Sequence, residues 1–301
     1  MLNITLRRKA RQLTRLIRQS AFTRRSGKRH KPVLAANGEL ALTFIGHSGF
    51  FVQMAGKNIL VDPNFARWLF IVKRLRWPGL RIKDLPPIDY VLITHAHFDH
   101  LHRPSLRAIA RATRRRSGRA PAIIVPHNVS DVVNCLGFRE VIELKWWQSH
   151  SVDQLSITHV PARHWGARML HDFHRGYGGY VLRSGKDSLY HAGDTAYFEG
   201  FREIGERLQP EVALLPIGAY SPPSFRNVHT SPEDAVQAFQ DLGSEWLVPM
   251  HYGSFRLGQE PMEEPLARLA HAARHAGISE RVLALTEGIT HLFQTPETQP
   301  A

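Results

Sequence analysis

The pattern of apolar and polar positions along the chain predicts an α/β protein. Residues 38–65 alternate and then turn, which is typical of two or three antiparallel strands with glycine-containing connections. Later apolar runs predict buried strands at 90–94, 120–128 and 245–253. Further strands are expected around 139–144, 151–160, 178–184 and 187–192, with a strand entering a loop at 210–220 and strand pieces around 281–293. Amphipathic periods between them predict helices, at 103–118, 129–138, 231–243 and 263–277. Because single helices interrupt the strands throughout, we expect one α/β domain over 39–293, with helices covering both sheet faces.

A basic extension, residues 1–38, precedes this domain, and a polar tail, residues 294–301, follows it. Residues 1–31 hold eleven Lys or Arg and no acid, so most of the net charge of +13 lies there and the rest of the chain is nearly neutral. Apolar residues of the extension recur at helical steps, at Leu6, Ala10, Leu13, Leu16, Ile17 and Ala21. The extension therefore fits a solvated tail, an amphipathic helix on an anionic membrane surface, or a mitochondrial-type presequence. Nucleic-acid binding is not favoured, because no basic stripe with interleaved aromatic residues continues into the domain.

The composition is that of an ordinary globular protein, with 43% hydrophobic and 22% charged residues among 301. The single cysteine, Cys135, excludes an intrachain disulfide and a cysteine-based zinc cluster. Cys135 lies in a predicted helix and is expected in the core. No stretch is long enough to span a bilayer, and no secretory signal is recognised. We expect a cytoplasmic protein, with a peripheral location at the inner face of the membrane as the alternative.

The stretch THAHFDHLH (94–102) follows a predicted strand and is rich in side chains that bind metals. His95 and His97 are two positions apart, so both point to the same side of an extended loop. Asp99 keeps this parity and His100 breaks it, so one loop can present ligands to each of two metals. Imidazole together with carboxylate favours zinc, with iron or manganese as lesser options.

Further ligands are expected just after other strands, where rigid elements fix them. His164 follows one strand, Asp194 lies in a glycine-containing turn after another, and His251 ends a third. Asp62, at the end of an early strand, is expected to accept a hydrogen bond from a ligand histidine. For His47, in an early turn, we expect no more than packing near the site, and for the other histidines surface or structural roles.

These motifs resemble a known family. His95-Ala-His97-Phe-Asp99-His100 is similar to the HxHxDH signature of the metallo-β-lactamase-fold hydrolases. Five later motifs are similar in order and spacing to the N-acyl-phosphatidylethanolamine-hydrolysing phospholipase D branch and its bacterial relatives: PARHW (161–165), HAGDT (191–195), PIGAY (216–220), HTSPEDAV (229–236) and HYGSF (251–255). The resemblance covers nearly all of residues 39–293. It implies a four-layer αββα sandwich with a metal site at the sheet edge.

The resemblance also implies two zinc ions and their ligands. One ion would be held by His95, His97 and His164, and the other by Asp99, His100 and His251, with Asp194 bridging both. The ions would turn a shared water into a hydroxide at neutral pH, and that hydroxide would attack the substrate. Asp99 or Asp194 would accept the proton of this hydroxide. His229, which opens HTSPEDAV, would steady an oxyanion or protonate the leaving group.

A phosphodiester of a phospholipid, hydrolysed in the manner of phospholipase D, is the substrate that the resemblance favours. Residues 66–85 mix tryptophan and aliphatic residues with Lys and Arg, so they form either a packed helix and loop or an apolar lip for a membrane or acyl chain. Two other classes stay open. One is a lactonase or another hydrolase of carboxylic or small phosphorylated substrates, and the other is a non-catalytic binding protein with a structural metal. The oligomeric state is open, a homo-oligomer included.

Overall fold

Two β-sheets packed face to face carry the fold. The computed structural model describes residues 23–36, 38–169 and 171–293. The first sheet has seven strands, ordered β15 (Thr290–Leu292), β1 (Ala41–Gly46), β2 (Gly49–Met54), β3 (Lys57–Val61), β6 (Tyr90–Leu92), β7 (Ala122–Pro126) and β8 (Glu140–Leu144). The second has six, ordered β14 (Trp246–Met250), β13 (Val212–Pro216), β12 (Asp187–His191), β11 (Gly179–Ser184), β10 (Leu155–Val160) and β9 (Ser149–Val152). A separate hairpin joins β4 (Trp68–Leu69) to β5 (Val72–Lys73).

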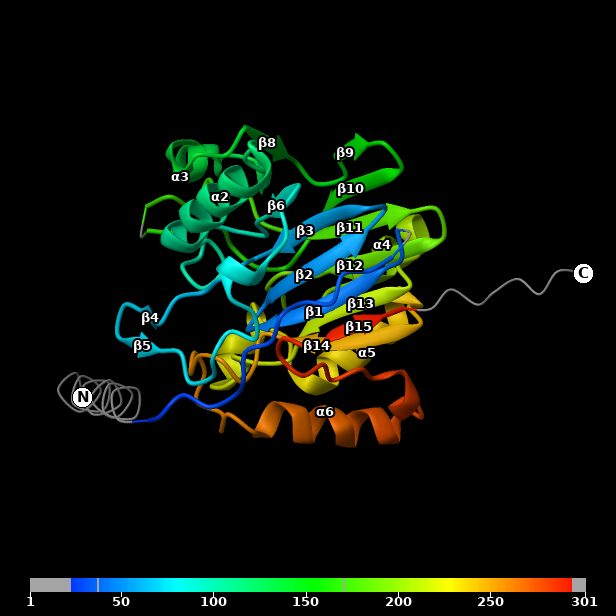
Figure 1. Ribbon diagram of the computed structural model, residues 1–301. Coiled ribbons are helices and arrows are strands. Elements are labelled where there is room, and N and C mark those ends of the chain that lie inside the picture. The colour runs from blue at the N-terminus through cyan, green and yellow to red at the C-terminus, as the bar shows by residue number, and fades with distance from the viewer. Residues whose placement is uncertain (1–22, 37, 170, 294–301) are drawn as a thin grey trace, which may run out of the picture.

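Helices lie outside the two sheets (Figure 1). The side of the first sheet carries α2 (Arg103–Ser117) and α3 (Ser130–Val133), and that of the second carries α4 (Gly200–Leu208), α5 (Pro232–Leu242) and α6 (Glu264–His275). Short 3₁₀ helices complete the described elements, at Ile82–Asp84, Asn134–Leu136, Pro223–Asn227 and Ser279–Arg281. This is the expected α/β sandwich of four layers, and the predicted fold class is confirmed.

Alternation along the inner strands explains why their sequences are apolar without interruption. In β6, Tyr90 and Leu92 belong to the core between the sheets, whereas Val91 and the following Ile93 belong to the core under α2. Successive side chains of a strand point to opposite faces, so a strand covered on both sides needs apolar residues at every position. The same alternation holds in β7, and the strands that precede the site loops are therefore firmly held.

Two well-formed helix starts follow directly after predicted site residues. The side chain of His102 caps α2 by accepting from the backbone N–H of Ser105, and Pro104 lies in the first turn. Ser231 caps α5 in a capping box with Asp234, two residues after His229. Such caps satisfy N–H groups that a helix start leaves open. They also fix the direction in which the chain leaves the site.

Some of the expected elements are wrong. Residues 151–160 are not one strand but parts of the hairpin β9–β10, with a turn at Asp153. The helix α4 was not predicted, because its nine residues include two glycines that obscure its period. The packed helix expected as one possibility in 66–85 is also wrong, since β4 and β5 form a short hairpin with Phe70 and Ile71 at its tip, and the helical structure in this range is a single 3₁₀ turn at Ile82–Asp84.

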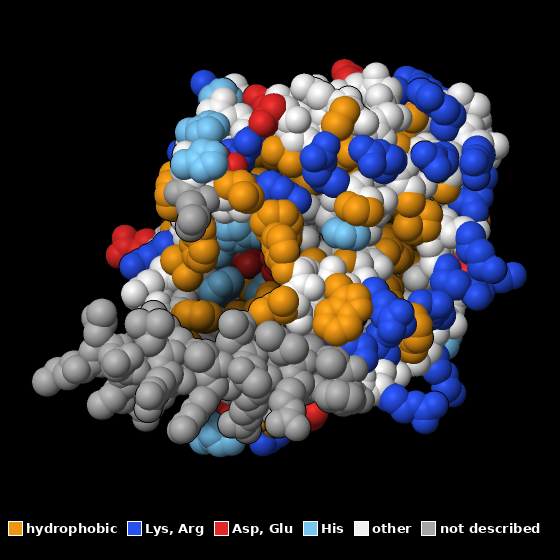
Figure 2. All heavy atoms as spheres, turned by 90° about the vertical axis from the view of Figure 1, so that its left-hand side faces the viewer, with side chains coloured by type: hydrophobic (Ala, Val, Ile, Leu, Met, Phe, Trp, Pro, Cys, Tyr) orange, Lys and Arg blue, Asp and Glu red, His pale blue; other side chains and the backbone are white. Residues whose placement is uncertain are grey.

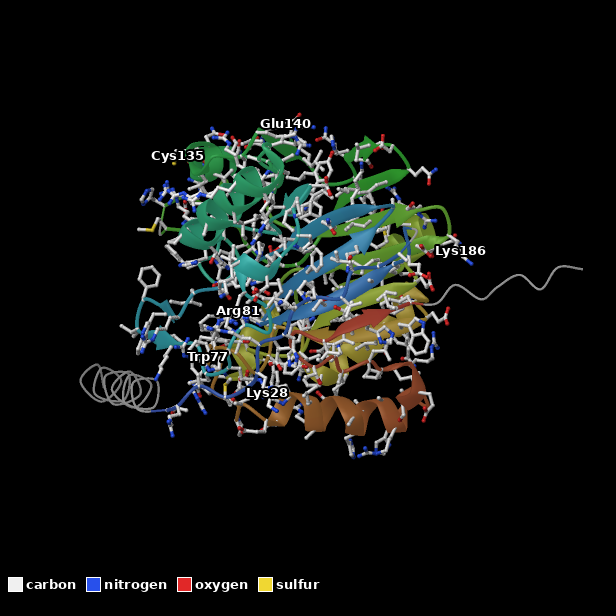
Figure 3. All side chains as sticks on the ribbon, in the orientation of Figure 1. Lys28, Trp77, Arg81, Cys135, Glu140 and Lys186 are labelled. Atoms are coloured by element: carbon white, nitrogen blue, oxygen red, sulfur yellow. The ribbon has the colours of Figure 1, made fainter. Side chains whose placement is uncertain are left out.

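Cys135 is exposed, so its predicted place in the core is wrong. The chain tightens into a 3₁₀ turn at Asn134–Leu136, in which Leu136 takes the buried position. A guanidinium nitrogen of Arg103 lies 3.0 Å from the Cys135 sulfur. Figure 3 shows Cys135 on the outside of the molecule, on the same side as Glu140.

The described part of the basic extension lies along the domain. The N–H of Ser26 donates to Leu75, and the N–H of Trp77 donates back to Ser26, each at 2.9 Å. The indole ring of Trp77 is stacked by the guanidinium groups of Arg25 and Arg29, at 3.2 and 3.9 Å from its centroid. Lys28, between them in sequence, lies near Trp77 in Figure 3. Residues 23–36 are thus anchored, whereas the helical face predicted for residues 6–21 lies outside the described residues.

No helix in the described ranges has the length and apolar character needed to cross a bilayer.

Candidate metal centre

The loop after β6, residues 94–102, brings the histidines and aspartate of the HxHxDH sequence to the edge of the first sheet and is called the metal loop below. β3, β6 and β7 are parallel neighbours, so their carboxyl ends meet at this edge. The chain then turns tightly, because the N–H groups of His100 and Leu101 both donate to the carbonyl of His97, at 3.2 and 2.8 Å. His95 and His100 are buried, and His97 and Asp99 are partly exposed. The floor of the site is thus a short and rigid loop.

Four side chains form a first cluster, in which the candidate ligand atoms all lie within 4.8 Å of one another: His95, His97, His164 and Asp194. Nδ1 of His97 is 2.9 Å from Nε2 of His95 and 3.3 Å from Nε2 of His164. Oδ2 of Asp194 lies 3.9 Å from Nε2 of both His95 and His164. Three imidazole nitrogens and one carboxylate oxygen around a common point are a donor set suited to zinc.

A second cluster within the same limit contains His47, Asp99, His100 and His251. Oδ2 of Asp99 lies 3.5 Å from Nε2 of both His100 and His251. Asp194 reaches this cluster as well, with Oδ1 3.2 Å from Nε2 of His100 and Oδ2 3.1 Å from Nε2 of His251. The carboxylate of Asp194 therefore lies between the two clusters.

The turn that carries Asp194 requires a glycine. Gly193 has a φ of +64°, and a Cβ there would come within 2.8 Å of the Gly178 carbonyl oxygen and 2.9 Å of the Thr94 side chain. The close approach brings the loop after β12 against the residue that precedes His95. Asp194 is thereby held next to the metal loop of the other sheet.

Hydrogen bonds to Nδ1 of His95, His100 and His164, on the side away from the centre, direct Nε2 of each ring toward the centre. Nδ1 of His100 lies 2.6 Å from Oδ2 of Asp62, and the hydroxyl of Thr94 donates to the same carboxylate at 2.7 Å. The Thr94 hydroxyl also lies 3.0 Å from Nδ1 of His95, and Nδ1 of His164 lies 2.9 Å from a backbone carbonyl oxygen. Ligand histidines in metal sites are normally held in this way through their second nitrogen.

Several buried polar atoms around the centre have no hydrogen-bond partner among the described residues: Nε2 of His100, both ring nitrogens of His251, Oδ1 of Asp194 and Nδ1 of His229. Buried polar groups in folded proteins are almost always paired, so these atoms call for a partner. Divalent cations held by the two clusters would satisfy Nε2 of His100, Nε2 of His251 and Oδ1 of Asp194, and the imidazole and carboxylate donors fit zinc, iron or manganese.

The ionisation of the site also fits cations. Burial raises the pKa of Asp194, but the imidazoles of His251 and His100 outweigh it and hold that pKa well below its usual range. Burial lowers the pKa of His95 far below its ordinary value, and the neighbouring His100 adds to this effect. In His251 burial again lowers the pKa, but the carboxylates of Asp194 and Asp99 raise it to about 9. A proton on such a ring balances the negative charge of the carboxylates in the absence of a cation. A bound cation would take over this role, so metal binding is expected to release protons.

His47 has a closer relation to the site than its sequence position suggested. Its Nε2 lies 2.9 Å from Oδ2 of Asp99, and its backbone carbonyl accepts from the N–H of His251 at 2.8 Å. The turn at Gly46–His47 therefore joins the metal loop to the loop after β14. The sequence indicates only that this turn connects two early strands. It does not indicate at which edge of the sheet the turn lies.

Arg168 is a second residue that the sequence did not reveal. Its guanidinium donates to the backbone carbonyls of Ala96 and Leu101, at 2.6 and 2.9 Å, and lies 3.9 Å from the centre of the Phe98 ring. These contacts tie the segment after β10 to the metal loop from outside.

His229 lies beside both clusters and belongs to neither of them, but it forms a smaller group with Asp194 and His251. Its Nδ1 is 3.8 Å from Oδ2 of Asp194, and its ring stacks on that of His251 with centroids 5.4 Å apart. Burial lowers the pKa of His229 to about 4, so the ring is neutral at neutral pH. The backbone N–H of His229 donates to Phe225 at 2.9 Å, which fixes the turn that presents the ring.

Figure 2 shows a hollow at this edge, with histidine and carboxylate side chains inside it and hydrophobic side chains around it. The ring of Trp165 lies 4.8 Å from that of His97, and the ring of Phe225 lies 6.4 Å from that of His229. Phe70, at the tip of the β4–β5 hairpin, is 73% exposed and packs edge-on against Phe98 of the metal loop. The entrance to the centre is thus apolar and aromatic.

Comparison with known sequences assigns the family. A family model described as the β-lactamase superfamily domain matches residues 57–252. An uncharacterised protein of Mycobacterium tuberculosis is 35% identical over 245 residues, which cover 78% of this chain and 64% of that protein. The mitochondrial N-acyl-phosphatidylethanolamine-hydrolysing phospholipase D of Saccharomyces cerevisiae is 31% identical over 266 residues, 83% of this chain and 55% of that protein. The chain thus spans less than two thirds of the length of these relatives.

A shorter relative is covered almost completely. A metal-dependent hydrolase of Methanopyrus kandleri is 30% identical over 253 residues, which cover 83% of this chain and 98% of that protein. Among solved structures, the metallo hydrolase Igni18 of Ignicoccus hospitalis has a TM-score of 0.62 at 27% identity over 85% of this chain and 99% of its own. An isothiocyanate hydrolase from Delia radicum gut bacteria shares the fold, with a TM-score of 0.68 at 22% identity over 84% of this chain and 98% of its own. The chain therefore belongs to the β-lactamase superfamily, among its metal-dependent hydrolases with the metallo-β-lactamase fold.

Proposed function

We propose that this chain is a di-zinc phosphodiesterase that hydrolyses phospholipids, N-acylphosphatidylethanolamine among them, in the manner of phospholipase D. The observation that carries the proposal is the pair of ligand clusters that share Asp194. Each cluster offers imidazole nitrogens together with a carboxylate, and the clusters are close enough for one carboxylate to serve both. Iron or manganese would be held by the same donors.

Two divalent ions bound here would lower the pKa of a water between them and supply a hydroxide nucleophile near neutral pH. His95, His97 and His164 would hold one ion and Asp99, His100 and His251 the other, with Asp194 between them. The chain's own contribution is to fix these ligands through Asp62 and Thr94 and to keep both aspartates ionised. Asp194 and Asp99 are the nearest bases for a proton released at the centre.

His229 is the candidate donor to the substrate. Its ring is neutral, lies beside both clusters and has an Nδ1 without a hydrogen-bond partner among the described residues. A neutral imidazole can donate a hydrogen bond to an oxyanion, and after it has taken up the proton released at the centre it can pass that proton to a leaving alkoxide. Its stacking on His251 holds the ring in place for either role.

The lipid substrate is supported by the apolar entrance. Phe70 at the entrance is 73% exposed, and Met169 and Phe173, in the segment after Arg168, are 55% and 68% exposed. Exposed apolar groups of this size mark sites of contact with another apolar phase. Two relatives, from Saccharomyces cerevisiae and Caenorhabditis elegans, are named as N-acyl-phosphatidylethanolamine-hydrolysing phospholipases D. A soluble, highly polar substrate would not need such an entrance.

The experiment is a substrate profile of zinc-loaded protein, with phosphatidylethanolamine and N-acylphosphatidylethanolamine in mixed micelles beside a panel of lactones. We expect release of the head-group alcohol from the phospholipids and no turnover of lactones. Asp99→Ala should abolish turnover, whereas His275→Ala, an exposed histidine on α6, should leave it unchanged. Lactone turnover alone would assign the carboxylic class instead. Unchanged turnover in Asp99→Ala would remove both enzyme assignments.

A further inference from the structure

A crevice outside the metal centre lies between the edge regions of the two sheets. Its walls come from the end of β8, from β10 and from the segment before β11, and its volume is about 300 Å³. The lining residues are His127, Leu144–Trp146, His159, Gly176 and Tyr177. None of these belongs to the clusters of candidate metal ligands. A volume of this size lies at the lower end of the range of small-molecule pockets.

A buried imidazole without partners lines the crevice. His159, on β10, is 1% exposed, and neither of its ring nitrogens has a hydrogen-bond partner in the part of the chain that the structure describes. The backbone of Lys145 and Leu144 favours the charged form of the ring, but no hydrogen bond of acceptable geometry results. A buried donor and a buried acceptor without hydrogen-bond partners lower the stability of the folded state. A bound group that pairs with both would remove this free-energy cost.

The remaining walls are aromatic and are held rigidly. The indole N–H of Trp146 donates to the carbonyl of Tyr177 at 2.6 Å, and the two rings meet edge to face with centroids 5.6 Å apart. Trp146 is nevertheless 43% exposed, so a face of its ring is open to a ligand. Tyr180, the neighbour of His159 on β11, has its ring centroid 5.1 Å from that of His159. Flat aromatic molecules are the ligands that such walls favour.

The charge in the crevice favours an uncharged ligand. Burial lowers the pKa of His159 to about 4, so the ring is neutral at neutral pH and offers one donor and one acceptor. His127, at the opening, lies 3.5 Å from the carboxylate of Glu143. The remaining charged group in the lining is Lys145, which is exposed. A hydroxyl group, which also donates one hydrogen bond and accepts others, matches a neutral imidazole better than a carboxylate does.

We propose that this crevice binds a small uncharged aromatic molecule that carries a hydroxyl group, with its ring against Trp146 and Tyr177 and its hydroxyl on the imidazole of His159. The site is independent of the proposed hydrolysis, since none of its residues takes part in that reaction.

The test uses the full-length, zinc-loaded protein and two probes of the same shape, 2-naphthol and 2-methoxynaphthalene, in isothermal titration calorimetry. We expect saturable binding of one 2-naphthol per chain and at least tenfold weaker binding of the methyl ether, which cannot donate a hydrogen bond. In His159→Phe the two probes should bind with equal affinity. In Trp146→Ala, a change at an exposed position, both should bind more weakly.

A measurement on the unaltered protein accompanies the variants, in case His159→Phe does not fold. The side-chain ¹⁵N resonances of His159 should shift when 2-naphthol is added. The shift caused by the methyl ether should be smaller. Absence of saturable binding, or a preference for 2-naphthol that persists in His159→Phe, would overturn the proposal. The first result would leave only water in the crevice, and the second would put the probe at the metal centre or elsewhere.

Discussion

Asp62 shows how much a single residue behind the ligands can matter. Its carboxylate accepts from the backbone N–H and the hydroxyl of Thr94 and holds Nδ1 of His100 at 2.6 Å. It is fully buried among these partners. The orientation of His100 and, through Thr94, of His95 depends on it.

We therefore expect Asp62→Asn to weaken zinc binding by about 10- to 100-fold, the usual effect of losing such a partner. Competition with a chelator of known affinity measures this directly. Asp153→Asn, which removes an exposed carboxylate paired with Lys57, is the control and should leave zinc affinity unchanged. Equal affinities of the wild type and Asp62→Asn would show that the ligands need no support from behind.

His159 makes a prediction about pH. The folded-state pKa of about 4 lies below the ordinary value of 6.5, so the unfolded chain takes up a proton first as the pH falls. The free energy of unfolding should therefore fall below pH 6.5, by about 2 kcal/mol at pH 5 from this residue alone. Tyr180 faces the ring and stays neutral in this range, because burial raises its pKa above the ordinary value.

Denaturant unfolding of the wild type and of His159→Phe at pH 7 and pH 5 isolates this contribution, because the other histidines are common to both proteins. The wild type should lose about 2 kcal/mol more than the variant between the two pH values. Parallel losses in both proteins would contradict the buried, neutral state of His159.

At the scale of elements, the start of α5 links stability to the site. Ser231 is fully buried, accepts from the N–H of Asp234 and donates to its carboxylate, and His229 lies two residues before it. Ser231→Ala should lower the free energy of unfolding by about 1 kcal/mol, the usual cost of a lost N-cap. Thermal unfolding measures this, with the exposed Ser279→Ala as control. A wild-type unfolding temperature in Ser231→Ala would show that the cap does not hold this turn.

The elements that could be predicted from the sequence are those with strong local signals. Pro104 and Gly118 delimit α2, and apolar runs mark the strands that are covered on both faces. The positions just after those strands gave the residues that the structure brings together, from His95 to His251, because parallel strands end at a common edge.

What could not be predicted depends on contacts between distant segments. The place of His47 beside Asp99 depends on the backbone of His47 pairing with that of Tyr252, more than 200 residues away. Arg168 contacts the metal loop from a segment without regular period. Cys135 was assigned to the core because helical spacing does not reveal a tightening of the last turn. Local patterns contain none of this information.

At the scale of the whole molecule, the apolar entrance and the basic extension meet on one face. The β4–β5 hairpin carries Phe70 at its tip, and Nζ of Lys73 in the same hairpin donates to the carbonyl of Thr23 at 2.7 Å. Thr23, the first described residue, therefore lies beside this hairpin, and residues 1–22, which hold six Lys or Arg, precede it in the sequence. We propose that the exposed apolar residues and the basic extension together bind an anionic bilayer.

Flotation with vesicles that contain anionic lipid tests this arrangement. Deletion of residues 1–22, which leaves Arg25 and Arg29 on Trp77, and the pair Phe70→Ser and Phe173→Ser should each reduce binding, the deletion most at low salt. Serine at the exposed Val33 and Leu34, away from the hairpin, is the matched control. Binding equal to the wild type in both test variants would remove the membrane proposal.

The central claim is that two metal ions share Asp194, and zinc titration of metal-free protein tests it most directly. Calorimetry with parallel elemental analysis should give two zinc ions per chain in the wild type. Asp194→Ala should weaken the binding of both ions, whereas His97→Ala should weaken the binding of one ion and leave the affinity for the other unchanged. One zinc ion per chain in the wild type, or two at unchanged affinity in Asp194→Ala, would contradict the shared centre.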